Sequence, residues 1–287
     1  MNKKTGKVYL VGAGPGDPEL MTRKAHRLLQ QADVILYDRL VNTDMLEDIK
    51  DGCQLVYVGK KEGLHVIPQE EINRLLRDYA LRYPLVVRLK GGDPFLFGRG
   101  GEEALYLREY GVPFEIVPGV TSALGAPAYA GIPVTHRGMA SMCSMITGHL
   151  AKEEVDELPW DALAAMQTLI FMMAVGARQY IAQQLLAHGR PEEEPVAFIE
   201  HGTTPKQRVT RTTLGVLART PPAVRSPAIL LVGEVARLHE ELDWFSAASE
   251  IPHLSGLEVM EVGEQGVVLA DARGQGEGEK QESEVLP

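Results

Sequence analysis

Two glycine-rich segments that carry charged residues are the part of this sequence best suited to chemistry. The first, Gly12–Pro18, reads GAGPGDP, and the second, Lys90–Glu103, reads KGGDPFLFGRGGEE. Glycine leaves backbone amides and carbonyls open to a ligand, and Arg99 and Glu102 add charge to the second segment. A solvated charged loop is the ordinary interpretation of these two residues, but the density of glycine around them favours a ligand-binding site.

The first segment looks like a nucleotide-binding loop but lacks the spacing of one. A dinucleotide-binding fingerprint places its third glycine three residues after the second, inside the first helical turn. Here Gly16 follows Gly14 by only two residues, and Pro15 and Pro18 delay the helix. A nicotinamide-dependent dehydrogenase is therefore disfavoured, although the acidic Asp38 follows the second predicted strand.

Alternating strands and helices must position these segments in the first 120 residues. Short apolar runs predict buried strands at Val8–Val11, Val34–Tyr37, Leu55–Val58, Leu85–Leu89 and Phe114–Val117. Amphipathic runs predict helices at Thr22–Ala32, Pro68–Leu81 and Glu102–Tyr110. Such alternation implies a mostly parallel sheet covered on both faces. Because the carboxyl ends of parallel strands meet at one edge, we expect both glycine-rich segments to face one crevice.

A second α/β unit is predicted after Pro133. Its strands are expected at Ser144–Thr147, Thr168–Met173, Val196–Glu200, Val209–Thr212 and Ala228–Val232. Its helices are expected at Trp160–Met166, Arg178–His188 and Leu214–Leu217. The segment Gly119–Ile132 predicts a connecting helix that fits either half. We therefore expect an α/β protein of two domains, 1–120 and 121–245, with mostly parallel or mixed sheets, followed by an acidic tail at 246–287.

Charge is distributed unevenly along the chain. The net charge is −10, and residues 246–287 hold nine acidic and two basic residues, so the first 245 residues carry only −3. A basic nucleic-acid-binding surface is excluded by this balance, and a small anionic ligand requires clustered arginines. Periodicity fades after Phe245, and Gly274–Glu284 is expected to be disordered, whereas Val267–Leu269 fits a short strand.

Composition excludes several other classes of protein. Hydrophobic residues make up 45 % and charged residues 24 % of the 287 residues, as in an average globular protein. No apolar run approaches the roughly 20 residues that cross a bilayer. Cys53 and Cys143 are far apart and have no metal-ligand spacing around them, so neither a disulfide framework nor a metal site is indicated. We expect a cytoplasmic protein without membrane or metal.

Several ordered motifs make the sequence resemble the tetrapyrrole methylases. They are Tyr9–Pro18, Tyr37–Val41, Gly59–Lys61, Gly91–Glu103, Pro118–Ala123, Gly131–Gly138 and Gly202–Arg208. The resemblance covers roughly residues 7–245, and the last three motifs narrow it to the branch that methylates uroporphyrinogen III. The family's fold places the active site in the cleft between two α/β domains and is typically homodimeric.

The resemblance implies a site for S-adenosylmethionine, bound in a folded form largely by main-chain groups. It assigns this cofactor-binding role to Pro15, Gly91, Gly92, Asp93, Leu96, Thr121, Ser122, Met173 and Gly202. The residue types agree in part, because glycines expose the backbone and Thr121 and Ser122 carry hydroxyls. Met173, at the end of a predicted strand, would otherwise be interpreted as ordinary core.

The implied substrate, uroporphyrinogen III, is a flexible macrocycle with eight carboxylates. Arginine binds carboxylates in bidentate geometry, and the resemblance assigns the substrate to Arg39, Arg99, Glu102 and Arg137. It assigns Asp38 as proton acceptor and Lys60 as proton donor. Arg99 is a competing candidate for the base, but its high pKa makes it a poor one. The residues alone leave open that Asp38 pairs with Arg39 or caps a turn, and that Lys60 is a solvated lysine.

The function that the resemblance implies is methylation at C2 and C7, which gives precorrin-2 through precorrin-1. This product would feed sirohaem, cobalamin or haem d1 synthesis. A later precorrin methyltransferase of the same fold and a non-catalytic tetrapyrrole carrier remain alternatives. Some relatives add an N-terminal dehydrogenase–ferrochelatase module, and because the resemblance begins at residue 7, we expect those steps to be done elsewhere.

Overall fold

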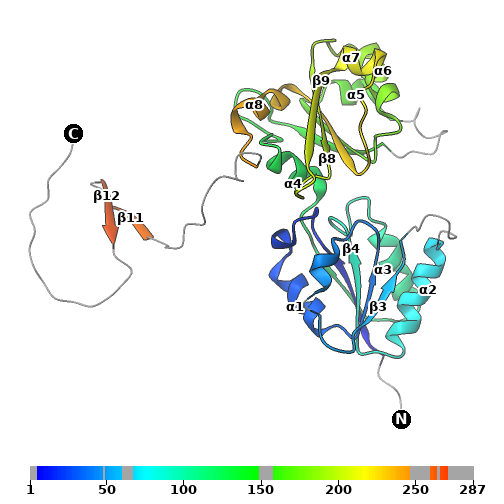
Figure 1. The fold of residues 1–287 in the computed structure, drawn as a ribbon. Helices are drawn as coiled ribbons and strands as arrows, with labels where there is room; N and C mark the ends of the chain where they lie inside the picture. Colours follow the sequence, from blue (N-terminus) through cyan, green and yellow to red (C-terminus); the bar gives the residue numbers. More distant parts are fainter. Residues whose placement is uncertain are drawn as a thin grey trace, which may run out of the picture. The chain divides into compact units, whose positions relative to one another are not determined.

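The structure of the protein is a computed structural model (Figure 1). It describes residues 5–47, 49–59, 67–148 and 158–245, together with the backbone of 259–263 and 266–270. The chain divides into two compact units, Met1–Ser246 and Ala247–Pro287. Both of the larger sheets belong to the first unit, and the second contains a two-stranded antiparallel hairpin, β11 (Val259–Gly263) and β12 (Gly266–Ala270).

The first sheet has five parallel strands in the order β3-β2-β4-β1-β5. The strands are β1 (Lys7–Gly12), β2 (Val34–Tyr37), β3 (Gln54–Tyr57), β4 (Leu85–Lys90) and β5 (Phe114–Val117). β1 and β4 are neighbours in register from Lys7 and Leu85 to Gly12 and Lys90. The predicted parallel sheet is therefore confirmed, and the glycine-rich segments leave it side by side.

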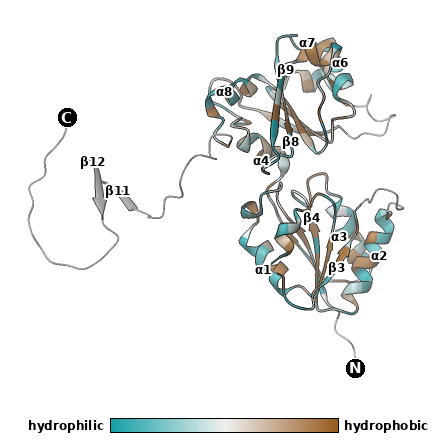
Figure 2. Ribbon diagram, viewed as in Figure 1, coloured by the Kyte–Doolittle hydropathy of each residue, from teal (hydrophilic) through white to brown (hydrophobic). Residues whose placement is uncertain are grey.

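Helices cover both faces of this sheet. α1 (Arg23–Gln31), capped by the Thr22 side chain, packs Leu28 and Leu29 against one face. α2 (Gln69–Ala80) and α3 (Gly100–Glu109) pack against the other face, where Leu76 and Leu107 are fully buried. Figure 2 shows hydrophobic residues on the strands and hydrophilic residues on the outer turns of α2.

The second sheet is mixed, with strand order β6-β7-β10-β8-β9. Its strands are β6 (Cys143–Thr147), β7 (Thr168–Met172), β8 (Pro195–Glu200), β9 (Arg208–Thr213) and β10 (Ala228–Val232). Only β6 and β7 pair in parallel, because β10 runs antiparallel to β7 and β8, and β9 antiparallel to β8. The prediction of mostly parallel or mixed sheets is confirmed.

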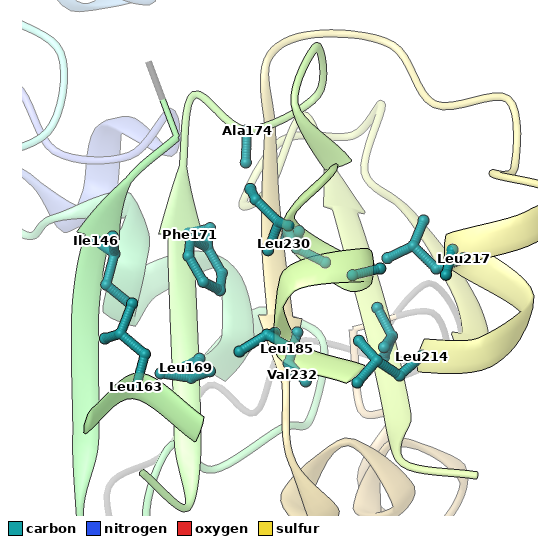
Figure 3. Packing of buried hydrophobic residues seen from close by; sticks show 14 of the residues in the cluster. Ile146, Leu163, Leu169, Phe171, Ala174, Leu185, Leu214, Leu217, Leu230 and Val232 are labelled. Atoms are coloured by element: carbon teal, nitrogen blue, oxygen red, sulfur yellow. The ribbon is translucent and has the colours of Figure 1, made fainter. Parts of the chain in front are cut away.

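Two apolar clusters cover the faces of the second sheet. On one face α5 (Trp160–Ala164), α6 (Arg178–Ala187) and α7 (Leu214–Arg219) surround buried strand residues such as Phe171 and Leu230 (Figure 3). On the other face lies α4 (Ser122–Tyr129), the helix predicted between the two halves, which packs Ala123 and Ala126 beside Ile170 and Leu231. α4 therefore shares its core with the second sheet.

Short elements complete the described fold. They are the 3-10 turns η1 (Pro18–Leu20), η2 (Thr43–Leu46) and η4 (Glu234–Leu238), and the helix α8 (His239–Leu242). Most predicted elements differ from those observed by one or two residues at their ends. The predicted strand Val267–Leu269 lies within β12, and the expectation of disorder at Gly274–Glu284 falls outside the described residues.

Candidate functional site

The two glycine-rich segments meet directly at the carboxyl edge of the first sheet. The Gly14 amide donates to the Gly92 carbonyl at 3.2 Å, and the Gly92 amide donates to the Gly14 carbonyl at 2.7 Å. Both glycines have positive φ angles, of 82° and 70°, which favour glycine over any other residue. Both segments therefore lie at one edge of the sheet, whereas the expectation that they face a crevice stays a prediction.

A third segment, which begins at Gly119, closes against the same point. A Cβ atom on Gly12 would lie 2.6 Å from both the Gly119 nitrogen and the Gly92 oxygen, so these backbones pack without room for side chains. Asp93 fixes this arrangement, because its Oδ1 accepts from the Phe95 amide at 2.8 Å and its Oδ2 accepts from the Gly119 amide at 3.0 Å. The Asp93 carboxylate thus holds the loop.

The amino-terminal half of α4 brings the second sheet to these loops. A Cβ on Gly125 would lie 2.8 Å from Cγ of Pro15, and a Cβ on Gly202 would collide with Ala126. The Asp17 amide also donates to the Thr203 hydroxyl at 3.1 Å. Pro15 and Gly202 are both predicted cofactor residues and are far apart in the sequence. In the structure they lie against the same helix, α4.

The remaining predicted cofactor residues also lie in this region. Thr121 caps α4 through a 3.3 Å hydrogen bond from the Ala123 amide, and Ser122 is the first residue of α4. A Cβ on Gly92 would lie 3.8 Å from the Ser122 nitrogen. Leu96 is partly buried against the apolar cluster that contains α4. A Cβ on Gly91 would lie 2.7 Å from the Leu40 Cβ, so the loop after β2 lies against Gly91.

Among the residues that the structure describes, five other than glycine hold left-handed backbone conformations, and all five follow strands or lie in these loops. They are Phe97, Arg99, Met173, His201 and Thr203, with φ between 47° and 67°. Such conformations cost about 1–3 kcal/mol and are concentrated at functional sites. Met173 is 50 % exposed at the end of β7, so the interpretation of this residue as ordinary core is wrong.

Asp38, the predicted proton acceptor, follows β2 and is held at both carboxylate oxygens. Its Oδ1 accepts from the Leu40 amide at 3.1 Å, and its Oδ2 pairs with Nη2 of Arg88 at 3.2 Å. The turn-capping alternative is thus observed. The cationic partner is Arg88 on β4, however, and not the adjacent Arg39, because Arg88 projects from the neighbouring strand toward Asp38.

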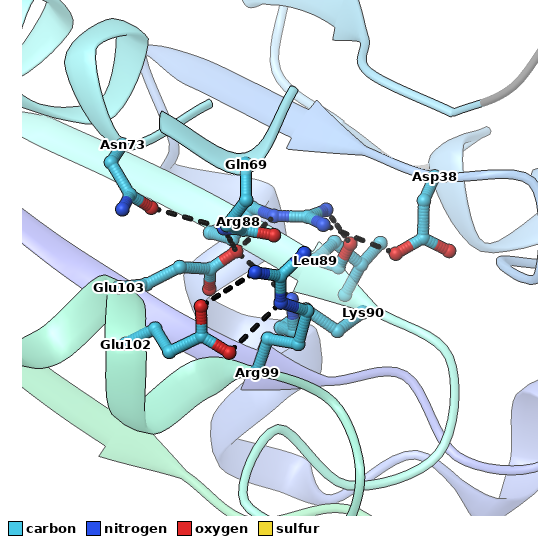
Figure 4. Close-up of polar contacts among 9 residues, drawn as sticks. All are labelled: Asp38, Gln69, Asn73, Arg88, Leu89, Lys90, Arg99, Glu102 and Glu103. Atoms are coloured by element: carbon cyan, nitrogen blue, oxygen red, sulfur yellow. Dashed lines mark hydrogen bonds and ion pairs between the residues drawn. The ribbon is translucent and has the colours of Figure 1, made fainter. Parts of the chain in front are cut away.

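Arg88 belongs to a buried charged cluster that also contains Lys90 and Glu103, here called the β4–α3 cluster (Figure 4). Oε1 of Glu103 accepts from Nε of Arg88 at 3.2 Å, from Nζ of Lys90 at 3.0 Å and from Nε2 of Gln69 at 3.2 Å. Burial and the nearby Arg88 lower the pKa of Lys90, while Glu103 opposes this shift. Buried charges of this kind persist only when they are paired.

Sequence reasoning assigned no role to Arg88, Lys90 or Glu103. The available signal was two cations at alternate positions of the strand LVVRLK, whose side chains share one face. That face packs against α2 and α3, which makes a charge on it costly unless a partner is present. Glu103 in the first turn of α3 is that partner.

The predicted substrate residues are exposed in three separate segments of the chain. Arg39 is exposed beside Asp38, and Arg99 forms a bidentate ion pair with Glu102, with distances of 2.8 and 2.6 Å. This ion pair raises the pKa of Arg99 further above its usual range. Arg137 is exposed in the tight turn closed by His136 and Ala140. Lys60 lies outside the described residues.

The described part of the chain shows neither a metal centre nor a membrane span. Among those residues no group of three histidine, cysteine or acidic side chains is placed to hold a metal ion. Nor does any helix within them combine the length and apolarity needed to cross a bilayer.

Comparisons with known proteins agree with this geometry. The family model described as Tetrapyrrole (Corrin/Porphyrin) Methylases matches residues 7–218. A siroheme synthase of Stutzerimonas stutzeri is 52 % identical over 249 residues, which are 86 % of this chain and 53 % of that protein. The chain thus spans about half the length of the curated relatives it matches.

Solved structures match over most of the chain. A uroporphyrin III C-methyl transferase from Thermus thermophilus matches in its native form with a TM-score of 0.71 and 49 % identity, covering 81 % of this chain and 100 % of that one. Its complex with S-adenyl homocysteine matches with a TM-score of 0.71 and 46 % identity, covering 81 % and 94 %. A cobalt precorrin-4 methyltransferase matches with a TM-score of 0.69 and 32 % identity, covering 80 % and 95 %.

The class that this fold and these matches define is a methyltransferase built from two α/β halves. More narrowly, the chain belongs to the tetrapyrrole methylase family.

Proposed function

We propose that this chain transfers methyl groups from S-adenosylmethionine to C2 and C7 of uroporphyrinogen III, giving precorrin-2. The observation that carries the proposal is the meeting of Gly14, Gly92 and Gly119 beside the start of α4. A solved structure that is 46 % identical to the chain is a uroporphyrin-III C-methyl transferase complexed with S-adenyl homocysteine, which supports both the donor and the substrate.

The residues at this junction fit a nucleoside-containing methyl donor. Gly91 and Gly92 are partly exposed and have no side chain to obstruct a ligand, Met173 is exposed, and the hydroxyls of Thr121 and Ser122 stand at the start of α4. In our proposal these residues hold the donor together with Pro15, Asp93, Leu96 and Gly202. The donor supplies an activated methyl group on a sulfonium. The protein mainly has to align donor and acceptor, an effect that can supply about 7–11 kcal/mol.

Substrate binding is assigned to the exposed arginines. Arg39 and Arg137 present guanidinium groups at the surface, and Arg99 is held by Glu102. A guanidinium binds a carboxylate through two parallel hydrogen bonds, which suits a macrocycle rimmed by carboxylates. Exposed apolar side chains accompany these arginines: Leu40 follows Arg39, and Phe95 and Phe97 precede Arg99. We assign them to contact with the apolar pyrrole faces.

Asp38 is assigned as the base that takes the proton from the macrocycle after methylation. Its side chain is 26 % exposed at the carboxyl edge of the sheet, so it can reach a ligand there. Arg99 is the weaker candidate, because the Glu102 ion pair raises the pKa of its guanidinium further. Lys60 keeps its assignment as proton donor from the resemblance alone.

A later precorrin methyltransferase is the second candidate, because a cobalt precorrin-4 methyltransferase shares the fold at 32 % identity. The higher identity to the Thermus thermophilus enzyme favours uroporphyrinogen III as the substrate. Relatives named siroheme synthase favour a place in sirohaem synthesis.

Two binding and turnover measurements test this assignment. Titration with S-adenosylhomocysteine should show saturable binding, and titration with NAD should show none. Turnover with uroporphyrinogen III should then exceed turnover with cobalt-precorrin-4. Faster turnover with cobalt-precorrin-4 would indicate the second candidate function, a later precorrin methyltransferase. Binding of the tetrapyrrole without methyl transfer would indicate a carrier.

A further inference from the structure

We infer that Arg88 is a positioning residue for methylation, which orients the Asp38 carboxylate from beneath the site. The inference rests on the proposed function, because Asp38 matters to catalysis only if the chain methylates a tetrapyrrole. Arg88 itself is 3 % exposed, so it acts through Asp38 and does not touch the substrate.

The geometry of Arg88 is fixed at three points. Nε pairs with Oε1 of Glu103 at 3.2 Å, Nη1 donates to the Leu89 carbonyl at 2.9 Å, and Nη2 pairs with Oδ2 of Asp38 at 3.2 Å. A planar guanidinium held at two points has little freedom left at the third. The direction in which Nη2 points is therefore set by Glu103 and the backbone.

The charges of the β4–α3 cluster explain why the Asp38 carboxylate pairs with Arg88. Arg88 and Lys90 are both buried and share one buried carboxylate, that of Glu103, which is 0 % exposed. When both cations are charged, the cluster holds one positive charge in excess, and the Asp38 carboxylate lies against it. Burial, and after it the positive charge of Arg88, lowers the pKa of Lys90.

Asp38 is held from the opposite side by its own turn. The Leu40 amide donates to Oδ1, so one oxygen is fixed by the loop and the other by the strand. Two anchors on different elements fix the carboxylate plane more narrowly than either alone. Misplacement of a reacting group by about 1 Å can cost on the order of 10²-fold in rate, so Arg88 has a measurable kinetic role.

A double-mutant cycle distinguishes positioning from a general loss of stability. Arg88→Met should lower the single-turnover rate of proton loss by on the order of 10²-fold. In the Asp38→Asn background the same change should alter the rate by no more than about twofold, because the group that it orients is gone. Arg88→Lys keeps the positive charge but loses the planar guanidinium. Its rate of proton loss should lie between those of the wild type and Arg88→Met.

Arg190→Lys is the matched control, because Arg190 is a buried arginine that pairs with Glu194 and with the carbonyls of Ala164 and Met166. It should affect stability alike in both backgrounds and leave proton loss unchanged. Equal losses from Arg88→Met in both backgrounds would overturn the inference. Binding of S-adenosylhomocysteine by each variant reports that it is folded.

A second readout needs no turnover. The carboxylate ¹³C resonance of Asp38, assigned from the spectrum of Asp38→Asn, should move in Arg88→Met and stay in place in Arg190→Lys. An unchanged resonance in Arg88→Met would overturn the inference even if activity fell. Absence of methylation by the wild-type protein would instead refute the proposed function, while the resonance would still decide whether Arg88 positions Asp38.

Discussion

At the scale of single residues, Asp38 combines three properties that suit a base. It stands at the carboxyl edge of a parallel sheet, it is partly exposed, and both of its oxygens are anchored by groups from different elements. An anchored carboxylate can accept a proton without first reorganising, which is how positioned groups act in general base catalysis.

Asp38→Asn should therefore bind S-adenosylhomocysteine like the wild type but turn over about 10²–10⁴ times more slowly. The change keeps the shape of the side chain and removes its basicity. Single-turnover experiments should follow S-adenosylhomocysteine formation and precorrin-2 absorbance separately, and a loss confined to the later step indicates a base that acts after methylation. The control is Asp78→Asn, because Asp78 is a partly exposed aspartate that pairs with Arg77. Wild-type rates for both steps in Asp38→Asn would exclude Asp38 as the base.

Arg99→Ala and Arg137→Ala should each weaken substrate binding much more than cofactor binding. Each removes a charge-assisted contact worth about 1.5–3 kcal/mol. Isothermal titration with S-adenosylhomocysteine and with the substrate separates the two effects. Arg219→Ala, which removes another exposed arginine paired with a glutamate, should change neither affinity. If cofactor affinity fell as far as substrate affinity, the division between the two subsites would be wrong.

At the scale of elements, α4 connects the glycine-rich loops to the second sheet. Its last residue, Tyr129, donates its hydroxyl to Oδ2 of Asp17 at 2.7 Å, and Gln207 donates to its carbonyl at 2.9 Å. The rings of Trp244 and Phe245 lie 5.0 Å from the Tyr129 ring, and Nε1 of Trp244 donates to the Ala128 carbonyl. The segment that ends at Phe245 therefore packs against the end of α4 and stabilises it.

Shortened chains should distinguish the contribution of Trp244 and Phe245 from that of the acidic tail. A chain that ends at residue 246 should keep its affinity for S-adenosylhomocysteine and its methyl transfer. A chain that ends at residue 243 loses two aromatic contacts, each worth about 0.5–1.5 kcal/mol, and should bind more weakly. Titration of both chains tests this, and a folded but inactive chain ending at residue 246 would show that the tail is needed.

The hydrogen bond between Tyr129 and Asp17 predicts a pH dependence. Burial and the hydrogen bond to Asp17 raise the pKa of Tyr129 to about 12, above the ordinary value of 10.0. Because the folded pKa is the higher one, the stabilisation is complete below pH 10 and is lost as pH rises toward 12. The difference in unfolding free energy between wild type and Tyr129→Phe, measured in urea, should narrow from pH 9 to pH 11. A difference in unfolding free energy that stays constant from pH 9 to pH 11 would contradict the raised pKa of Tyr129.

Sequence periodicity predicts elements well here and predicts their pairing less well. The alternation of apolar strands and amphipathic helices gives the parallel order of the first sheet. In the second sheet, β10 is apolar throughout and β8 is apolar up to its last residue, Glu200. A buried apolar strand looks the same in the sequence whether it pairs in parallel or antiparallel. The direction of β10 was therefore beyond reach of the sequence alone.

At the scale of the whole molecule, the candidate site depends on contacts between distant parts of the chain. The proposed cofactor residues follow from sequence motifs, because each loop carries its own glycines. The Asp38–Arg88 pair joins residues 50 positions apart on neighbouring strands, and adjacency along the chain pointed to Arg39 instead. Only strand order, which places β2 beside β4, reveals the true partner. The predicted homodimer stays a prediction.

The number of methyl groups transferred to each product tests the central claim most directly. The protein should be incubated with uroporphyrinogen III and S-adenosylmethionine labelled on its methyl group, and the product analysed by mass. We predict two labelled methyl groups per macrocycle, at C2 and C7, with two molecules of S-adenosylhomocysteine released. An unmethylated macrocycle, or one that carries methyl groups at other carbons, would contradict this account.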